Sequence, residues 1–86
     1  MSPASIRNLI LRVLKLADPY PLPFEQLLAE CNLQARPSLE AAALGQHLAW
    51  LQEIRYVDAI PDPLDPQNPT AARWLITEPG QAALRK

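Results

Sequence analysis

Few side chains of this 86-residue chain have the chemistry that catalysis or metal binding requires. His47 is the only histidine, and no second metal ligand or nucleophile stands at helical spacing from it. Cys31, the only cysteine, falls on an apolar stripe, where a thiol acts as a small hydrophobic group. With Gly45 and Gly80 as the only glycines, the chain has no phosphate-binding glycine loop. The sequence therefore predicts no enzyme, no metal site and no cofactor.

Three helices must position these residues, and the spacing of apolar side chains predicts them. Apolar residues recur every three to four positions at about residues 3–16, from about residue 23, and at about residues 39–53. Ser2 and Ser38 are expected to cap the first and third helices, because a serine hydroxyl accepts from free backbone N–H groups there. Asn32 is expected to end the second helix in a left-handed conformation. The core stripe predicted for the third helix is Ala41, Leu44, Leu48 and Leu51.

A two-stranded ribbon is predicted after the third helix. Residues 56–60 alternate as a strand, and residues 73–76 form the return strand. The loop over residues 61–72 contains four prolines, which remove ladder hydrogen bonds and stiffen the chain. Leu22 is expected to pair briefly at the edge of the ribbon, and Thr77 opens a last short helix that ends near Arg85.

This order of helices, ribbon and final cap resembles the winged helix-turn-helix superfamily, typical of bacterial transcription regulators. Ile76, Thr77 and Gly80 are similar to the Leu-Thr-x-x-Gly sequence that follows the wing in that superfamily. Tyr56 follows the third helix as in many members, with Arg55 where they have glycine. The resemblance covers roughly residues 5–84. It implies an α+β, mostly helical winged helix-turn-helix with a three-helix core, a two- to three-stranded ribbon as wing and a short C-terminal helix, in one domain over residues 1–86.

The segment between the second and third helices departs from the common bacterial pattern. The interval from Asn32 to Leu48 is longer than that pattern has. Either the third helix is longer at its N-terminus or the turn is looser. The resemblance also implies that Leu33 tucks into the core at this turn and that the third helix is the recognition helix.

The resemblance implies double-stranded DNA as a partner, and the residues supply part of the chemistry. Gln46 can read adenine in bidentate fashion, and Ala42 can meet a thymine methyl group. Phosphate contacts supply most of the affinity for DNA, yet no basic residue lies within the third helix and the wing carries aspartates. The residues expected to contact DNA are Arg36, Ser38, Ala42, Gln46 and Arg73.

A protein-binding or dimerising winged helix is the alternative, with a second copy or another protein as the partner. Ala42, Gly45 and Ala49 lie on one side of the third helix, where small side chains let another surface approach closely. Trp50 lies beside them, and tryptophan is enriched at interface hot spots. Packing over the edge of the domain's own core is the competing interpretation of Trp50.

Charge and composition set the remaining expectations. The net charge is −1 and the sequence pI about 5.7, unlike the basic balance of a dedicated nucleic-acid binder. Residues 1–17 carry Arg7, Arg12 and Lys15 with no acidic residue, but these charges are expected to spread around the first helix. A single cysteine excludes an intrachain disulfide, and the sequence shows neither a membrane-length apolar run nor a signal peptide. We therefore expect a cytoplasmic protein with no membrane partner.

Overall fold

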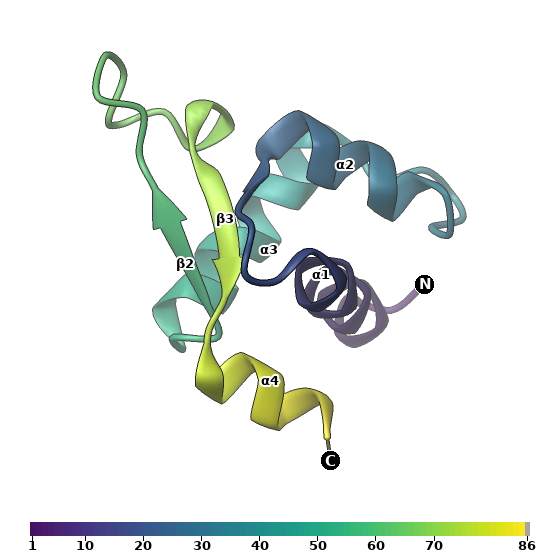
Figure 1. Ribbon diagram of the computed structural model, residues 1–86. Coiled ribbons are helices and arrows are strands. Elements are labelled where there is room, and N and C mark those ends of the chain that lie inside the picture. The colour runs from purple at the N-terminus through teal and green to yellow at the C-terminus, as the bar shows by residue number, and fades with distance from the viewer. Residues whose placement is uncertain (86) are drawn as a thin grey trace.

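The computed structural model describes residues 1–85, and Lys86, the last residue of the expected domain, lies outside the described residues. The elements are α1 (Pro3–Ala17), β1 (Leu22–Pro23), α2 (Phe24–Asn32), α3 (Ala41–Glu53), β2 (Val57–Ile60), the 3₁₀ helix η1 (Pro69–Ala71), β3 (Arg73–Ile76) and α4 (Glu78–Leu84). The sheet stands beside α1, α2 and α3, with the β2–β3 loop at one end and α4 at the other (Figure 1). This architecture confirms the predicted winged helix-turn-helix.

Two helices begin at the capping residues that the sequence predicts. The Ser2 hydroxyl accepts a hydrogen bond from the Ser5 backbone N–H at 3.1 Å and so caps α1. The Thr77 hydroxyl accepts from the Gly80 backbone N–H at 3.1 Å and caps α4. Because Pro19 has no N–H to continue the helical ladder, α1 ends before it.

The sheet has β3 at its centre, antiparallel to both neighbours, in the order β1-β3-β2. Leu22 pairs with Trp74, which confirms the predicted edge pairing. Alternation along β3 buries Trp74 and Ile76 against the helices and turns Arg73 outward. Val57 of β2 and Leu22 of β1 are buried in the same core, so all three strands contact the helices.

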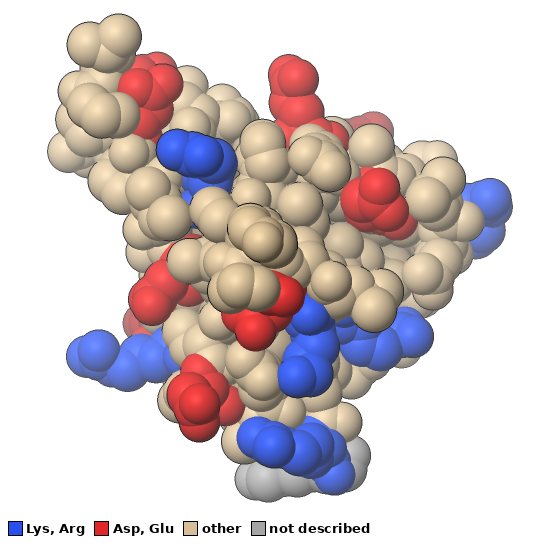
Figure 2. Space-filling view, viewed as in Figure 1, with Lys and Arg blue, Asp and Glu red and all other residues tan. Residues whose placement is uncertain are grey.

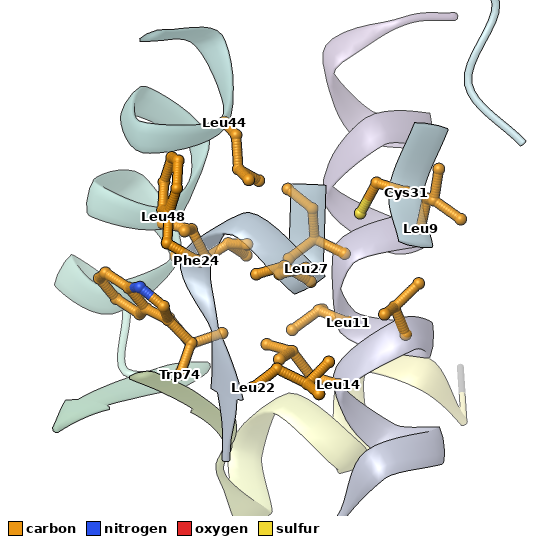
Figure 3. Packing of buried hydrophobic residues seen from close by; sticks show 14 of the residues in the cluster. Leu9, Leu11, Leu14, Leu22, Phe24, Leu27, Cys31, Leu44, Leu48 and Trp74 are labelled. Carbon is orange, nitrogen blue, oxygen red and sulfur yellow. The ribbon is translucent and has the colours of Figure 1, made fainter. Parts of the chain in front are cut away.

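Trp74 fixes the ribbon to the helices. Its ring is 2% exposed and shares the core with α2 and α3. Its indole Nε1 is buried and has no hydrogen-bond partner among residues 1–85, so apolar contact alone holds the ring. Figure 3 shows this core with Leu9, Leu11 and Leu14 of α1, Leu22 of β1, Phe24, Leu27 and Cys31 of α2, and Leu44 and Leu48 of α3.

The end of α2 differs from the prediction. Asn32 remains helical, and Leu33 at the cap is right-handed, with φ −65° and ψ −25°, so the predicted left-handed end at Asn32 is wrong. The Asn32 side-chain amide is used in a different way: it accepts from the Leu39 N–H at 2.6 Å and donates to the Leu39 carbonyl at 3.0 Å. Leu33 is 70% exposed instead of tucked into the core, where Ala35, at 2% exposed, lies instead.

The start of α3 also differs, because the turn before it is the looser of the two alternatives. Asn32 holds Leu39 in place before the helix begins, so α3 starts at Ala41 and Glu40 is its N-cap. The predicted Ser38 cap and the start at Leu39 are therefore wrong. Leu39 is buried, whereas Ala41 is exposed and does not belong to the core stripe.

The junction of α3, β2 and α4 depends on backbone contacts. Arg55, at the position where many winged helices have glycine, is left-handed with φ 67°, a conformation that glycine adopts at less cost. The Thr77 hydroxyl donates to the Arg55 carbonyl at 2.6 Å, and the Thr77 N–H donates to the Tyr56 carbonyl at 3.1 Å. Gly80 lies so close that a Cβ there would overlap the Tyr56 carbonyl oxygen. These contacts tie the end of α3 to the start of α4.

The two glycines are expected to respond in opposite ways to alanine. Gly45→Ala places a methyl group in open space within α3 and should stabilise the fold by about 0.5–1 kcal/mol through helix propensity. Gly80→Ala should destabilise it by about 1–3 kcal/mol, because the added methyl group forces the backbone near Tyr56 to move. Urea denaturation of both variants checks the pair, and equal shifts of the unfolding midpoint would contradict this account.

Candidate functional site

Helix α3 has one buried face and one open face. Leu44, Leu48 and Leu51 are at most 1% exposed and fix the inner face against the core. Ala42, Gln46 and Ala49 are exposed, and no element within residues 1–85 covers their side of the helix. Of the expected interface residues, Gly45 is half-buried on the same helix, with nothing within 4 Å of where a Cβ would stand. The open face of α3 is smooth and carries no basic residue.

The N-cap of α3 and the turn before it carry one acidic and one basic side chain, Glu40 and Arg36. Glu40 is exposed at the N-cap and makes no capping hydrogen bond with its side chain. Ser38 is exposed in the turn before it. Arg36 Nη1 donates to the carbonyls of Asn32 at 3.1 Å and Ala35 at 2.7 Å, so this guanidinium satisfies the C-terminal end of α2. A phosphate bound here would have to share Arg36 with those carbonyls.

The wing carries Arg73 at its base and aspartates in its loop. Arg73 is exposed on the outer face of β3. The loop is folded by its own polar side chains: the Asp62 carboxylate accepts from the Leu64 N–H at 2.9 Å, and the Asn68 amide donates to the Asp65 carboxylate at 3.0 Å. Acidic side chains gather toward the tip of this loop, and a basic side chain lies nearer its base (Figure 2). One cation therefore stands beside a negatively charged loop.

Trp50 packs against α1 through Arg7. The guanidinium carbon of Arg7 lies 3.8 Å from the centroid of the Trp50 ring, a cation–π contact. Arg7 Nε also donates to His47 Nδ1 at 3.2 Å. Trp50 is 42% exposed, so part of its ring covers the edge of this domain and part remains open to solvent. Of the basic residues of α1, Arg7 is thus held against α3.

The groups that could carry chemistry are held in unreactive forms. Burial, together with the nearby Glu30 carboxylate, raises the pKa of the Cys31 thiol to about 11. Burial and the Arg7 charge lower the pKa of His47 below 6.5, so its Nδ1 accepts from Arg7 as a neutral imidazole. Within residues 1–85, no three histidine, cysteine, aspartate or glutamate side chains are grouped to hold a metal ion. The same residues contain no helix of the length and apolarity that a membrane span needs.

The structure brings some of the predicted site residues together and separates others. Ala42, Gly45, Gln46 and Ala49 share α3, whereas Arg73 stands on the sheet. Sequence reasoning passed over Arg55 as a cation, although it is exposed directly after α3. Its presence in place of a glycine is the signal that could have singled it out.

Comparison with solved structures also identifies a winged-helix fold. A crystal structure of a MarR family transcription regulator matches 93% of this chain with a TM-score of 0.67 and 19% sequence identity. The chain spans 46% of the length of that protein. No protein-family model matches this chain, and no curated protein matches it. The comparison therefore shows the winged helix-turn-helix fold alone.

The neutral state of His47 predicts a pH dependence of stability. The unfolded chain protonates His47 near its ordinary pKa of 6.5, whereas the folded chain does so only at lower pH. Between these two values the unfolded state binds more protons, so the contribution of His47 to the free energy of unfolding decreases as the pH falls through this window. Urea midpoints across the window should therefore fall more for the wild type than for His47→Gln, which cannot titrate. Equal pH slopes for the two proteins would contradict this assignment.

Proposed function

We propose that this domain binds double-stranded DNA, with α3 in the major groove and the β2–β3 wing beside it. The observation that carries the proposal is the open face of α3. None of the other described elements covers this face, and the leucines on the opposite face are fully buried. A helix held in this way can enter a groove of about 12 Å width. The fold that this chain shares with a MarR family transcription regulator supports the same function by analogy. Such a regulator would work in the cytoplasm.

The proposed contacts divide into base and phosphate contacts. Gln46 would read an adenine edge through its amide, and Ala42 would meet a thymine methyl group. Arg36 and Arg73 would neutralise phosphates on either side of α3, and the Ser38 hydroxyl would donate to a phosphate oxygen. Glu40 at the N-cap repels phosphate, so binding by one copy should be weak.

Few phosphate contacts predict a shallow salt dependence. Two arginine contacts give a slope of log K against log salt concentration of about −1.8. Arg73→Ala should reduce the slope to about −0.9, and fluorescence anisotropy on mixed duplexes at low salt measures both. Arg85→Ala removes the same charge from the C-terminal end of α4 and serves as the control. No binding by the wild type, or an equal loss in both variants, would refute the proposal.

Protein docking on the open face of α3 is a second candidate function. The open space at Gly45, with Ala42 and Ala49 beside it, favours close approach of another surface. The face also lacks the cations that DNA binding uses, and the exposed part of Trp50 would lie at its edge. The partner would be a second copy of this chain or another protein.

One substitution separates the two candidates. Ala49→Arg adds a cation to the open face, so it should tighten DNA binding and steepen the salt slope by about 0.9 if α3 lies in a groove. The same bulky charge should abolish a protein complex formed on that face. Anisotropy titration and chemical cross-linking of the same sample measure the two effects. Unchanged DNA affinity together with an unchanged cross-linking pattern would remove both functions from this face.

A further inference from the structure

A groove with an apolar floor runs between the C-terminal halves of α1 and α2, away from the site described above. It consists of two adjoining hollows of about 250 and 240 Å³ that share Val13, Leu16 and Gln34. Helix α1 also contributes Arg12, and α2 contributes Glu30. Both hollows are open to solvent within the described residues.

Two leucines project beside this groove without packing into the core. Leu16 is 87% exposed and Leu33 is 70% exposed. Leu33 is turned outward because α2 ends in a right-handed conformation and Ala35 fills the core position. The two leucines and the groove floor therefore leave apolar surface exposed to water, and a bound partner could cover this surface.

The two walls of the groove carry opposite charge. Helix α1 contains Arg7, Arg12 and Lys15 and no acidic residue, whereas α2 contains Glu25 and Glu30 and no basic residue. On this face acidic side chains lie over α2 and basic side chains over α1 (Figure 2). Arg12 and Lys15 both line the groove, and Lys15 also donates to the Gln81 amide of α4 at 2.8 Å, so Arg12 is the cation used for the contact described next. A surface of this kind complements itself after rotation by half a turn.

We propose that a second copy of this chain docks on the groove and forms a two-fold symmetric dimer. A two-fold axis parallel to the groove sets α1 of one copy against α2 of the other. Arg12 of each copy then faces Glu30 of the other, and the exposed Leu16 and Leu33 cover each other's apolar surface. Such an isologous contact uses the same patch on both subunits, so one set of residues satisfies both.

The dimer leaves the proposed DNA-binding face free. The C-terminal end of α1 points toward the viewer in Figure 1, and α3 lies behind α1 and α2. Each copy can therefore present α3 to DNA while the groove is occupied. The inference does not depend on DNA binding, since the groove and α3 have separate residues.

Sedimentation equilibrium of the full chain from about 1 µM to about 1 mM tests the dimer. The wild type should show a concentration-dependent monomer–dimer equilibrium. Leu33→Asp should raise the dissociation constant at least about tenfold, because a charge would enter the apolar contact. Arg12→Glu and Glu30→Arg should each weaken the dimer, because each places like charges opposite one another. The double variant should restore the dimer, because opposite charges again face each other across the two-fold axis.

Matched controls make the outcome specific to this face. Leu64→Asp makes the same change in the wing, where Leu64 is 94% exposed, and should leave the dimer intact. Ala49→Arg should also leave it intact, whereas loss of the dimer in that variant would assign the contact to α3 and overturn the inference. A wild type that stays monomeric throughout, or a dimer indifferent to Leu33→Asp, would overturn it as well. Circular dichroism confirms that each variant folds, as expected for exposed positions.

Discussion

The pairing of β3 between β1 and β2, with Trp74 pressed onto the helices, is the constraint on which the other features depend. β3 joins the segment after α1 to the segment after α3, because Leu22 and Ala59 both lie opposite Trp74. With the Trp74 N–H unpartnered among residues 1–85, the free energy of this contact comes from buried apolar area, at about 25 cal/mol per Å². Since α3 runs into β2 through Arg55, the same pairing fixes how α3 is presented.

The ribbon and helices could be predicted from the sequence because their signals are local. Residues 73–76 alternate in burial as the sequence indicated, and Ser2 and Thr77 cap helices through bonds within three residues. The turn before α3 could not be predicted in the same way. Asn32 has two uses, a left-handed helix end or a side-chain clamp on Leu39, and only the packed structure selects the second.

The candidate site also has some features that depend on local sequence and others that depend on tertiary packing. The exposure of Ala42, Gln46 and Ala49 follows from the leucine spacing of α3, which a single helix determines. The state of the cations does not follow from the sequence. Arg36 bonds to carbonyls one and four residues before it at the end of α2, whereas Arg7 is held by His47 and Trp50, partners that only tertiary structure supplies. A count of basic residues therefore overstates what is free to meet phosphate.

The burial of Cys31 has a practical consequence for following motions of the domain. Its thiol is fully buried in the core, and its pKa of about 11 leaves almost no thiolate at neutral pH. Alkylating reagents attack the thiolate, so the folded domain resists them and labelling requires an opening, local or global, that exposes Cys31. Because Cys31 is the only cysteine, the rate of labelling reports a single opening event. The chain thus contains a built-in reporter of opening around the end of α2 that requires no engineered probe.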